Sequence, residues 1–364
     1  MMITHNLGYP RIGNNREIKK AIEGYWSEEI NYNQLIQTSA EIKQKNWLLQ
    51  KDLGIDLIPS NDFSFYDHVL DMAFTINVIP ERYSDLKGNS EESKLNQYFS
   101  LARGYQKGGV DIIAMEMTKW FDTNYHYIVP EFYKNQKFNL SNLKFIDEFL
   151  EAKKLGIITK PILLGPVSFL LLGKEKELDF DRIDILKNLL PVYFEILKML
   201  IINGAKWIQF DEPFLALDLT QKQKKAFKMA YLRIRENFPE IHILVATYFE
   251  GLHDNSELAM SLPIDAIHLD LVKAPEQLEQ IMNLITKDKI LSLGIVDGRN
   301  IWKNNFENSL KLINNAIAKI GEERVMIAPS CSLLHAPCDL DLESNEKVLP
   351  PEIKQWFAFA KQKI

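Results

Sequence analysis

The chain has 364 residues, of which 46% are hydrophobic and 25% are charged, and its formal net charge is −6. This composition is typical of a globular protein with a full core, and the acidic balance argues against a nucleic-acid-binding protein, which needs a clustered basic surface. Only two cysteines occur, Cys331 and Cys338, which excludes a disulfide framework and favours a reducing cytoplasm.

Nothing in the chain predicts a membrane or secretory segment. The longest apolar stretch, 162–172, contains Gly165, Pro166 and Ser168 and is too short to cross a bilayer. The first residues lack the basic and apolar regions of a signal peptide. We therefore expect a cytoplasmic protein.

Short apolar runs closed by Gly, Pro, Asp or Ser recur along the chain and predict strands buried on both faces. They lie near 4–8 and at 55–59, 110–115, 161–164, 206–210, 242–246, 266–269, 290–295 and 325–328.

Helical patterns separate these runs. Ile18 and Ile22 lie on an apolar stripe behind Asn15, which is a suitable N-cap. A long helix is predicted from about Asn33 to Gly54, and another over 189–200, where apolar residues recur at helical spacing. The polar composition of segment 85–97, with Gly88, Asn89 and Ser90, predicts a solvated loop or mobile insertion.

The chain ends in a predicted helix that opens at Pro350-Pro351. Its apolar face contains Ile353, Trp356, Phe357 and Ala360. Such a face predicts docking on the barrel, or a chain that normally continues.

Alternating strands and helices predict a parallel sheet. Eight or nine units predict a single (β/α)₈ TIM-type barrel over 1–364, with additional N-terminal helices and a polar insertion. One strand candidate is surplus, and we expect an end strand to be the extra one.

The first candidate site is the glycine-punctuated turn and helix start at 7–20. Free N–H groups at a helix start favour anions. Arg16 and Lys19 share one face of the first turn, where cations oppose the helix dipole, so a bound anion would explain them. A solvated lysine-rich helix face is the alternative.

The second candidate is segment 116–127, which crowds Lys119 with aromatic and amide side chains. It follows the run 110–115, so we expect it at the C-terminal rim of the barrel, where active sites of this fold lie. Its aromatic residues can wall a flat ligand while Lys119 supplies a point charge. The alternative is a packed aromatic loop.

Asp211 and Glu212 form a third candidate, because they directly follow the buried run 207–210 and precede Pro213. Paired carboxylates can act as acid and base, bind an amino group or hold a metal. Alternatively, one caps a helix and the other forms a salt bridge.

Cys331, His335 and Cys338 form the fourth candidate. Zinc motifs usually pair cysteines two to four residues apart and need a fourth ligand. The spacing of seven between these cysteines therefore argues against a metal site.

Taken together, these stretches resemble the N-terminal half of cobalamin-independent methionine synthase. The matching segments keep one order along the chain: LGYPRIG and NREIKKA within 7–21, IPSNDFSFYDHVLD at 58–71, AMEMTKWFDTNYHY at 114–127, LLGPVSFL at 163–170, IQFDEP at 208–213, GIVDGRNIW at 294–302 and IAPSCSLLHAP at 327–337.

The resemblance implies a two-barrel enzyme that transfers a methyl group from 5-methyltetrahydropteroyltriglutamate to homocysteine. In the family, a C-terminal barrel carries zinc, which converts the homocysteine thiol to a thiolate. The N-terminal barrel holds the glutamate tail of the folate. This role carries over to Arg16, Glu17, Ile18, Lys19 and Lys119.

The chain departs from the complete enzyme because it lacks the zinc ligands of the catalytic barrel. The segment 246–250 has neither His nor Cys, and only Cys331 resembles the final zinc ligand. We expect no metal and no catalytic residue on this chain, and no turnover without the C-terminal barrel, in the same chain or a separate one. The other readings are a self-sufficient metal-dependent barrel enzyme using Asp211, Glu212, His335 and the cysteines, and a non-catalytic structural or folate-binding module.

Overall fold

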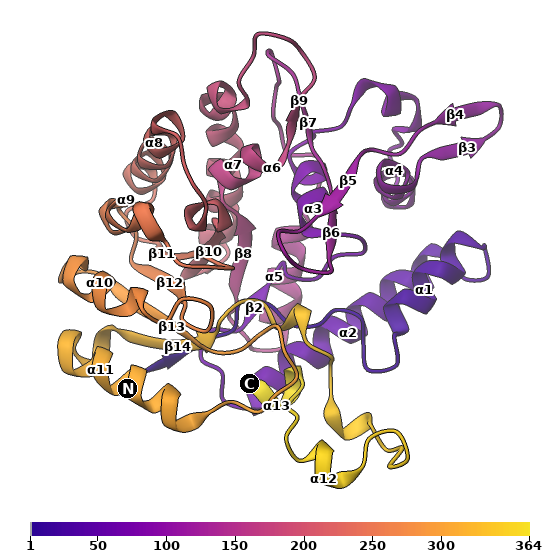
Figure 1. Cartoon of the computed structure of the whole chain (residues 1–364). Helices are drawn as coiled ribbons and strands as arrows, with labels where there is room; N and C mark the ends of the chain where they lie inside the picture. The colour runs from indigo at the N-terminus through magenta and orange to yellow at the C-terminus, as the bar shows by residue number, and fades with distance from the viewer. Residues whose placement is uncertain (1) are drawn as a thin grey trace.

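The computed structural model describes residues 2–364, and its centre is one parallel sheet of eight strands. Around the sheet the order is β1, β14, β13, β12, β11, β10, β8 and β2. A parallel bridge between His5 and Leu57 joins β1 to the segment that leads into β2, so the sheet closes into a barrel (Figure 1). The strands are β1 (Ile3–Thr4), β2 (Pro59–Ser60), β8 (Lys160–Leu164), β10 (Trp207–Asp211), β11 (His242–Ala246), β12 (Ala266–Asp270), β13 (Ile290–Val296) and β14 (Val325–Pro329).

Helices connect successive strands and surround the barrel (Figure 1). None of those within residues 2–364 combines the length and the apolar character that a membrane span needs. They are α1 (Glu17–Trp26), α2 (Tyr32–Asp52), α3 (His68–Thr75), α4 (Glu91–Arg103), α5 (Lys144–Lys154), α6 (Pro166–Leu172), α7 (Leu186–Ile202), α8 (Gln221–Asn237), α9 (Ser256–Ser261), α10 (Gln277–Leu284), α11 (Phe306–Ile320), α12 (Pro351–Lys354) and α13 (Ala360–Lys363).

The core follows from the two kinds of periodicity in the sequence. Every residue of β8 and β12 is buried, as expected for strands covered on both faces. A second apolar cluster joins α1, α2, α3 and α4 through side chains such as Ile18, Leu35 and Phe99. The N-terminal helices and the insertion therefore share a core of their own.

The helices predicted from about Asn33 and over 189–200 are confirmed as α2 and α7. A capping box at Asn31 and Gln34 begins α2. Beyond its end, Gly54 has a φ of 83°, a conformation that glycine adopts without strain.

The strand predicted at 110–115 is the surplus one, so our expectation that an end strand would be extra is wrong. Only Val110–Ile112 is extended, as β4, and it pairs antiparallel with β3 (Tyr105–Lys107) outside the barrel. Gly108 and Gly109, both with positive φ, turn the chain between the two strands. This hairpin projects away from the barrel (Figure 1). The remaining short strands are β5 (Met117–Lys119), β6 (His126–Ile128), β7 (Glu131–Phe132) and β9 (Lys174–Glu175).

The loop predicted at 85–97 is also wrong over its second half, because α4 begins at Glu91. Ser90 caps this helix by accepting a hydrogen bond from the Ser93 amide. Tyr98 and Phe99 bury its inner face against the N-terminal helices. Tertiary packing thus orders a segment whose polar start looks like a loop.

The single C-terminal helix predicted from Pro350-Pro351 is in fact two short ones. α12 ends at Lys354, and Phe357 then pairs with Trp302 in an antiparallel bridge. Trp356 is 63% exposed, whereas Ala360, at the start of α13, is fully buried. The predicted continuous apolar face is therefore absent.

Candidate functional site

The mouth of the barrel, at the C-terminal ends of its strands, is covered by the turn between β5 and β6. Phe121 in this turn packs edge-on against Phe249, which follows β11, with ring centroids 6.0 Å apart. Asp122 pairs with Arg299, which follows β13, at 2.8 Å. Segment 116–127 thus lies at the rim as predicted, but by reaching over from the insertion rather than by following a barrel strand.

A cavity of about 380 Å³ opens at this rim, between the loop after β1 and the loop after β14. Because β1 and β14 are neighbours in the sheet, their following loops meet. The Leu333 amide donates to the Gly8 carbonyl at 2.9 Å and fixes one loop against the other. The cavity is lined by Pro10, Arg11, Ile12, Gly13, Asn14, Arg16, Tyr125, Leu334, His335, Ala336, Pro337, Cys338, Asp339, Leu342, Glu343 and Phe359.

Arg16 lies at this cavity as the residue before α1. It has a φ of 60°, and its side chain does not cap the helix. The N-cap predicted at Asn15 is therefore wrong. The Glu17 carboxylate instead accepts from the Asn15 amide at 2.8 Å, in the turn before the helix.

Glu17 and Ile18 thus have structural contacts of their own. The side chain of Ile18 is 4% exposed and belongs to the core of the N-terminal helices. Its backbone amide has a partner too, the Ile12 carbonyl at 3.3 Å. Lys19 is exposed on α1 and lies 3.8 Å from Glu23, one turn later.

Lys119 is exposed at the end of β5, where it pairs with His126 of β6. It does not line the cavity, and neither does Lys19. The hairpin that carries Lys119 nevertheless reaches the cavity through Tyr125, whose hydroxyl donates to the Leu334 carbonyl at 3.0 Å. Of the three predicted cations, the structure thus brings only Arg16 into the cavity.

Asp211 and Glu212 are both buried, and each has partners within the protein. Glu212 accepts from the Ser168 amide at 2.8 Å in the first turn of α6, and from the Tyr231 hydroxyl at 2.9 Å. Asp211 accepts from the Tyr248 hydroxyl at 2.6 Å. Burial raises the pKa of Asp211 to about 6 and that of Glu212 to about 7, while these hydrogen bonds act in the opposite direction.

Lys160 is fully buried inside the barrel and was not found by reading the sequence. Its ammonium group contacts the Asn6 carbonyl, at 3.2 Å, and the side chain of Gln209. Burial lowers its pKa to about 7, while the charge of Asp211 acts in the opposite direction. Gln209 also donates to Asp211 at 2.7 Å, so these groups form one internal polar network.

Cys331, His335 and Cys338 do not form a metal centre. Within residues 2–364, no three His, Cys, Asp or Glu side chains are grouped as metal ligands. Burial raises the pKa of the Cys331 thiol well above its ordinary value and that of Cys338 to about 11. Seven residues separate the two cysteines, whereas zinc motifs usually pair cysteines two to four residues apart. His335 instead packs edge-on against Tyr125 and Phe249.

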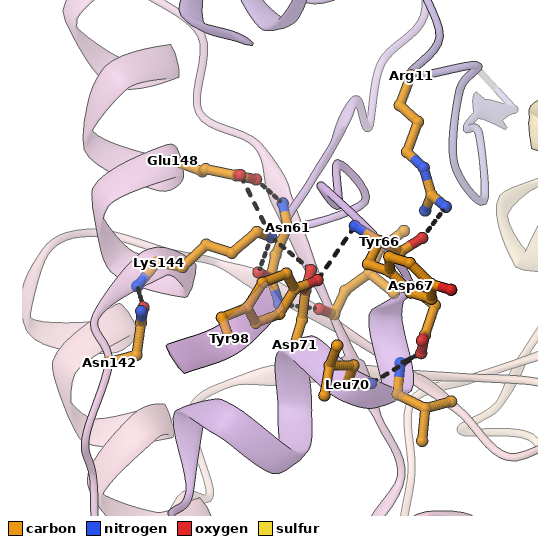
Figure 2. A network of polar contacts seen from close by, with 12 residues as sticks. Arg11, Asn61, Tyr66, Asp67, Leu70, Asp71, Tyr98, Asn142, Lys144 and Glu148 are labelled. Carbon is orange, nitrogen blue, oxygen red and sulfur yellow. Dashed lines mark hydrogen bonds and ion pairs between the residues drawn. The ribbon is translucent and has the colours of Figure 1, made fainter. Parts of the chain in front are cut away.

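Arg11 is the residue of the cavity that sequence reasoning missed. It lies in the same glycine-punctuated turn as Arg16, but outside the helical spacing that drew attention to Arg16 and Lys19. Its Nη2 donates to the Tyr66 carbonyl at 2.5 Å (Figure 2). The signal available in the sequence was a second arginine in the turn after the first strand.

The fold and this rim define a (β/α)₈ barrel with an arginine-bearing cavity at the C-terminal ends of its strands. A family model described as the N-terminal domain of cobalamin-independent synthase matches residues 3–321. The chain belongs to this family.

Curated relatives agree over the whole chain. It is 58% identical over 366 residues to a 5-methyltetrahydropteroyltriglutamate–homocysteine methyltransferase of Cytophaga hutchinsonii, covering 100% of this chain and 47% of that protein. Proteins of the same name from Flavobacterium johnsoniae and Xylella fastidiosa strain 9a5c are 58% and 49% identical to it. Each of these matches covers 100% of this chain and 47% of the relative. The chain therefore spans about half the length of the curated relatives it matches.

Solved structures support the fold. A B12-independent methionine synthase from Shewanella sp. W3-18-1 aligns with a TM-score of 0.64 at 15% identity, over 92% of each chain. A putative vitamin-B12-independent methionine synthase from Listeria monocytogenes aligns with a TM-score of 0.63 at 14% identity, also over 92% of each.

Proposed function

We propose that this chain is the folate-tail-binding half of a cobalamin-independent methionine synthase. In this proposal the complete enzyme transfers a methyl group from 5-methyltetrahydropteroyltriglutamate to homocysteine in the cytoplasm. The observation that carries the proposal is the match of the entire chain, at 58% identity, to half of proteins with this methyltransferase name. Free cysteines, rather than a disulfide, agree with a reducing compartment.

The role of this half is to hold the acidic tail. Arg16 in the rim cavity and the exposed Lys19 supply positive charge along α1, and Lys119 supplies it on the hairpin that covers the mouth. A folate tail of three glutamates offers a row of carboxylates to such a surface. Glu17 would contact the ligand through its backbone, because its carboxylate accepts from the Asn15 amide. Ile18 would position the helix start, because its side chain lies in the core and its amide donates to the Ile12 carbonyl at 3.3 Å.

The zinc implied by the family resemblance would be held by the other half. The cysteines of this chain are not grouped with other metal ligands in the part that the structure describes, so they do not fit this metal. When bound, zinc supplies thiolate activation of homocysteine. This chain's contribution is to bind and orient the methyl donor.

Complementation of the two halves tests the proposal. Methyl transfer should be measured with this chain alone, with a separately expressed C-terminal half alone, and with both. We expect methionine formation at a substantial rate only when both halves are present. A chain that turns over alone as fast as the mixture, and carries stoichiometric tightly bound zinc by elemental analysis, would instead favour a self-sufficient metalloenzyme.

A further inference from the structure

The rim cavity contains two arginines that the structure leaves without a carboxylate partner. Among residues 2–364, no Asp or Glu lies within ion-pair distance of Arg11 or Arg16, whereas Asp339 in the same lining pairs with Lys361 at 2.9 Å. Glu343 is the other acidic residue of the lining. Lys361 also pairs with Asp341 at 2.7 Å, so the lining has no overall excess of cations, and its available positive charge is that of the two unpaired arginines.

The Arg11 guanidinium is held by the Tyr66 carbonyl, and most of its N–H donors remain available. Its one hydrogen bond, to the Tyr66 carbonyl, uses a single N–H of the five that a guanidinium carries. The Tyr66 peptide is itself fixed, because its amide donates to the Tyr98 hydroxyl at 3.1 Å. Tyr98 in turn donates to Asp71 at 2.6 Å (Figure 2). Arg11 is thus a positioned cation rather than a mobile surface side chain.

The side chains around Arg11 include neutral groups that can contact a bound anion. Tyr125 and His335 wall the cavity with aromatic rings 5.2 Å apart. Burial lowers the pKa of His335, and the charges of Arg299 and Arg11 lower it further, to about 4. This ring is therefore neutral. A neutral imidazole can donate a hydrogen bond to a carboxylate, and guanidinium groups bind carboxylates in a bidentate manner.

We propose that Arg11, together with Arg16, seats in this cavity the carboxylate of the first glutamate of the folate. This inference rests on the proposed function and extends it. The first glutamate is present whatever the length of the tail, so it suits the cavity between the two loops. Lys19 and Lys119 lie outside the cavity and suit the further glutamates, which extend towards solvent. Arg11 is then an anchor for every folate, and the two lysines discriminate by tail length.

Equilibrium binding to the complete two-half enzyme tests this division of roles. The dissociation constants of monoglutamyl and triglutamyl 5-methyltetrahydrofolate should be measured by calorimetry for Arg11→Gln. We expect both constants to rise by about tenfold, and by the same factor, because one charge-assisted contact is lost in each complex. Arg11→Lys, which keeps the charge, should recover part of the loss. A change below about twofold for the monoglutamyl folate would overturn the inference.

Two controls keep the result specific. Arg233→Gln makes the same charge change on α8, where Arg233 is exposed and pairs with Glu236, and should leave both constants unchanged. Thermal unfolding shows whether Arg11→Gln is folded. If it is not, binding to Arg11→Lys decides the matter. We then expect both folates to bind more weakly by the same factor, and unchanged binding would contradict the inference. If the wild-type enzyme binds monoglutamyl and triglutamyl folate equally well, the tail-binding role of the lysines is refuted, but the role of Arg11 is not.

Discussion

At the scale of single residues, Glu212 shows why a conspicuous acidic pair need not be an active site. Gly165 leaves the space that its carboxylate occupies, since a Cβ at that position would lie 2.1 Å from Oε1. The carboxylate then holds the first turn of α6 through the Ser168 amide and contacts α8 through Tyr231. The sequence placed Glu212 correctly at a strand end, but its hydrogen-bond partners come from helices that local spacing cannot bring together.

The raised pKa of Glu212 makes stability depend on pH in a defined direction. Its folded-state pKa of about 7 exceeds the ordinary value of 4.5, so ionisation weakens the folded state as pH rises from about 4.5 to 7. Glu212→Gln removes this titration. Between pH 5 and 8, urea unfolding should show the wild type losing roughly 2–3 kcal/mol more stability than the variant.

A matched control is available on α7, where Glu195 is exposed to solvent. Glu195→Gln should follow the wild-type pH dependence. Identical pH dependence in the wild type and Glu212→Gln would show that Glu212 is not the titrating group.

At the scale of elements, a partly buried ionic network joins α3 and α5 to the loop after β2. Lys144 on α5 lies 3.4 Å from Asp71 on α3 and 3.2 Å from Glu148 on its own helix (Figure 2). It also donates to the side chain of Asn61 at 2.8 Å, while Glu148 accepts from the Asn61 amide at 2.9 Å. This network supports the Tyr98 and Tyr66 groups that hold Arg11.

Lys144→Met should destabilise the protein by about 3 kcal/mol, because it leaves the buried Glu148 and the partly buried Asp71 with less compensation. The loss is at the lower end for a buried pair, since Lys43 remains 3.8 Å from Glu148. Urea unfolding measures it. Lys154→Met, on the exposed face of the same helix, is the control and should cost less than about 0.5 kcal/mol. Equal stability of the two variants would mean that the network is not stabilising.

Some elements of this fold are determined by local sequence signals, and others by tertiary contacts. Helices α2 and α7 were predictable because their apolar periodicity and end signals lie within the helix. The run 110–115 is apolar like a barrel strand, yet Val110 is 41% exposed in a hairpin. Whether an apolar run joins the barrel depends on which neighbours it meets, and this information is not local.

At the scale of the whole molecule, the barrel and its cationic rim were predictable, whereas the cavity was not. Alternating strands and helices predicted the barrel, and the family resemblance predicted Arg16, Lys19 and Lys119. The cavity depends on two loops more than 300 residues apart, after β1 and β14, which only barrel closure brings together. Arg11 becomes noticeable only once those loops meet.

The preference of the complete two-half enzyme for tail length tests the central claim most directly. The measurement is the ratio of kcat/KM for triglutamyl over monoglutamyl 5-methyltetrahydrofolate at low salt, in the wild type and in the double variant Lys19→Ala/Lys119→Ala. Several exposed ion pairs of 0.2–1 kcal/mol each predict a wild-type ratio of roughly tenfold to a hundredfold. The double variant should approach a ratio of one, and Lys225→Ala/Lys228→Ala on the exposed side of α8 should keep the wild-type ratio. Equal kinetics for both folates in every variant would contradict the account.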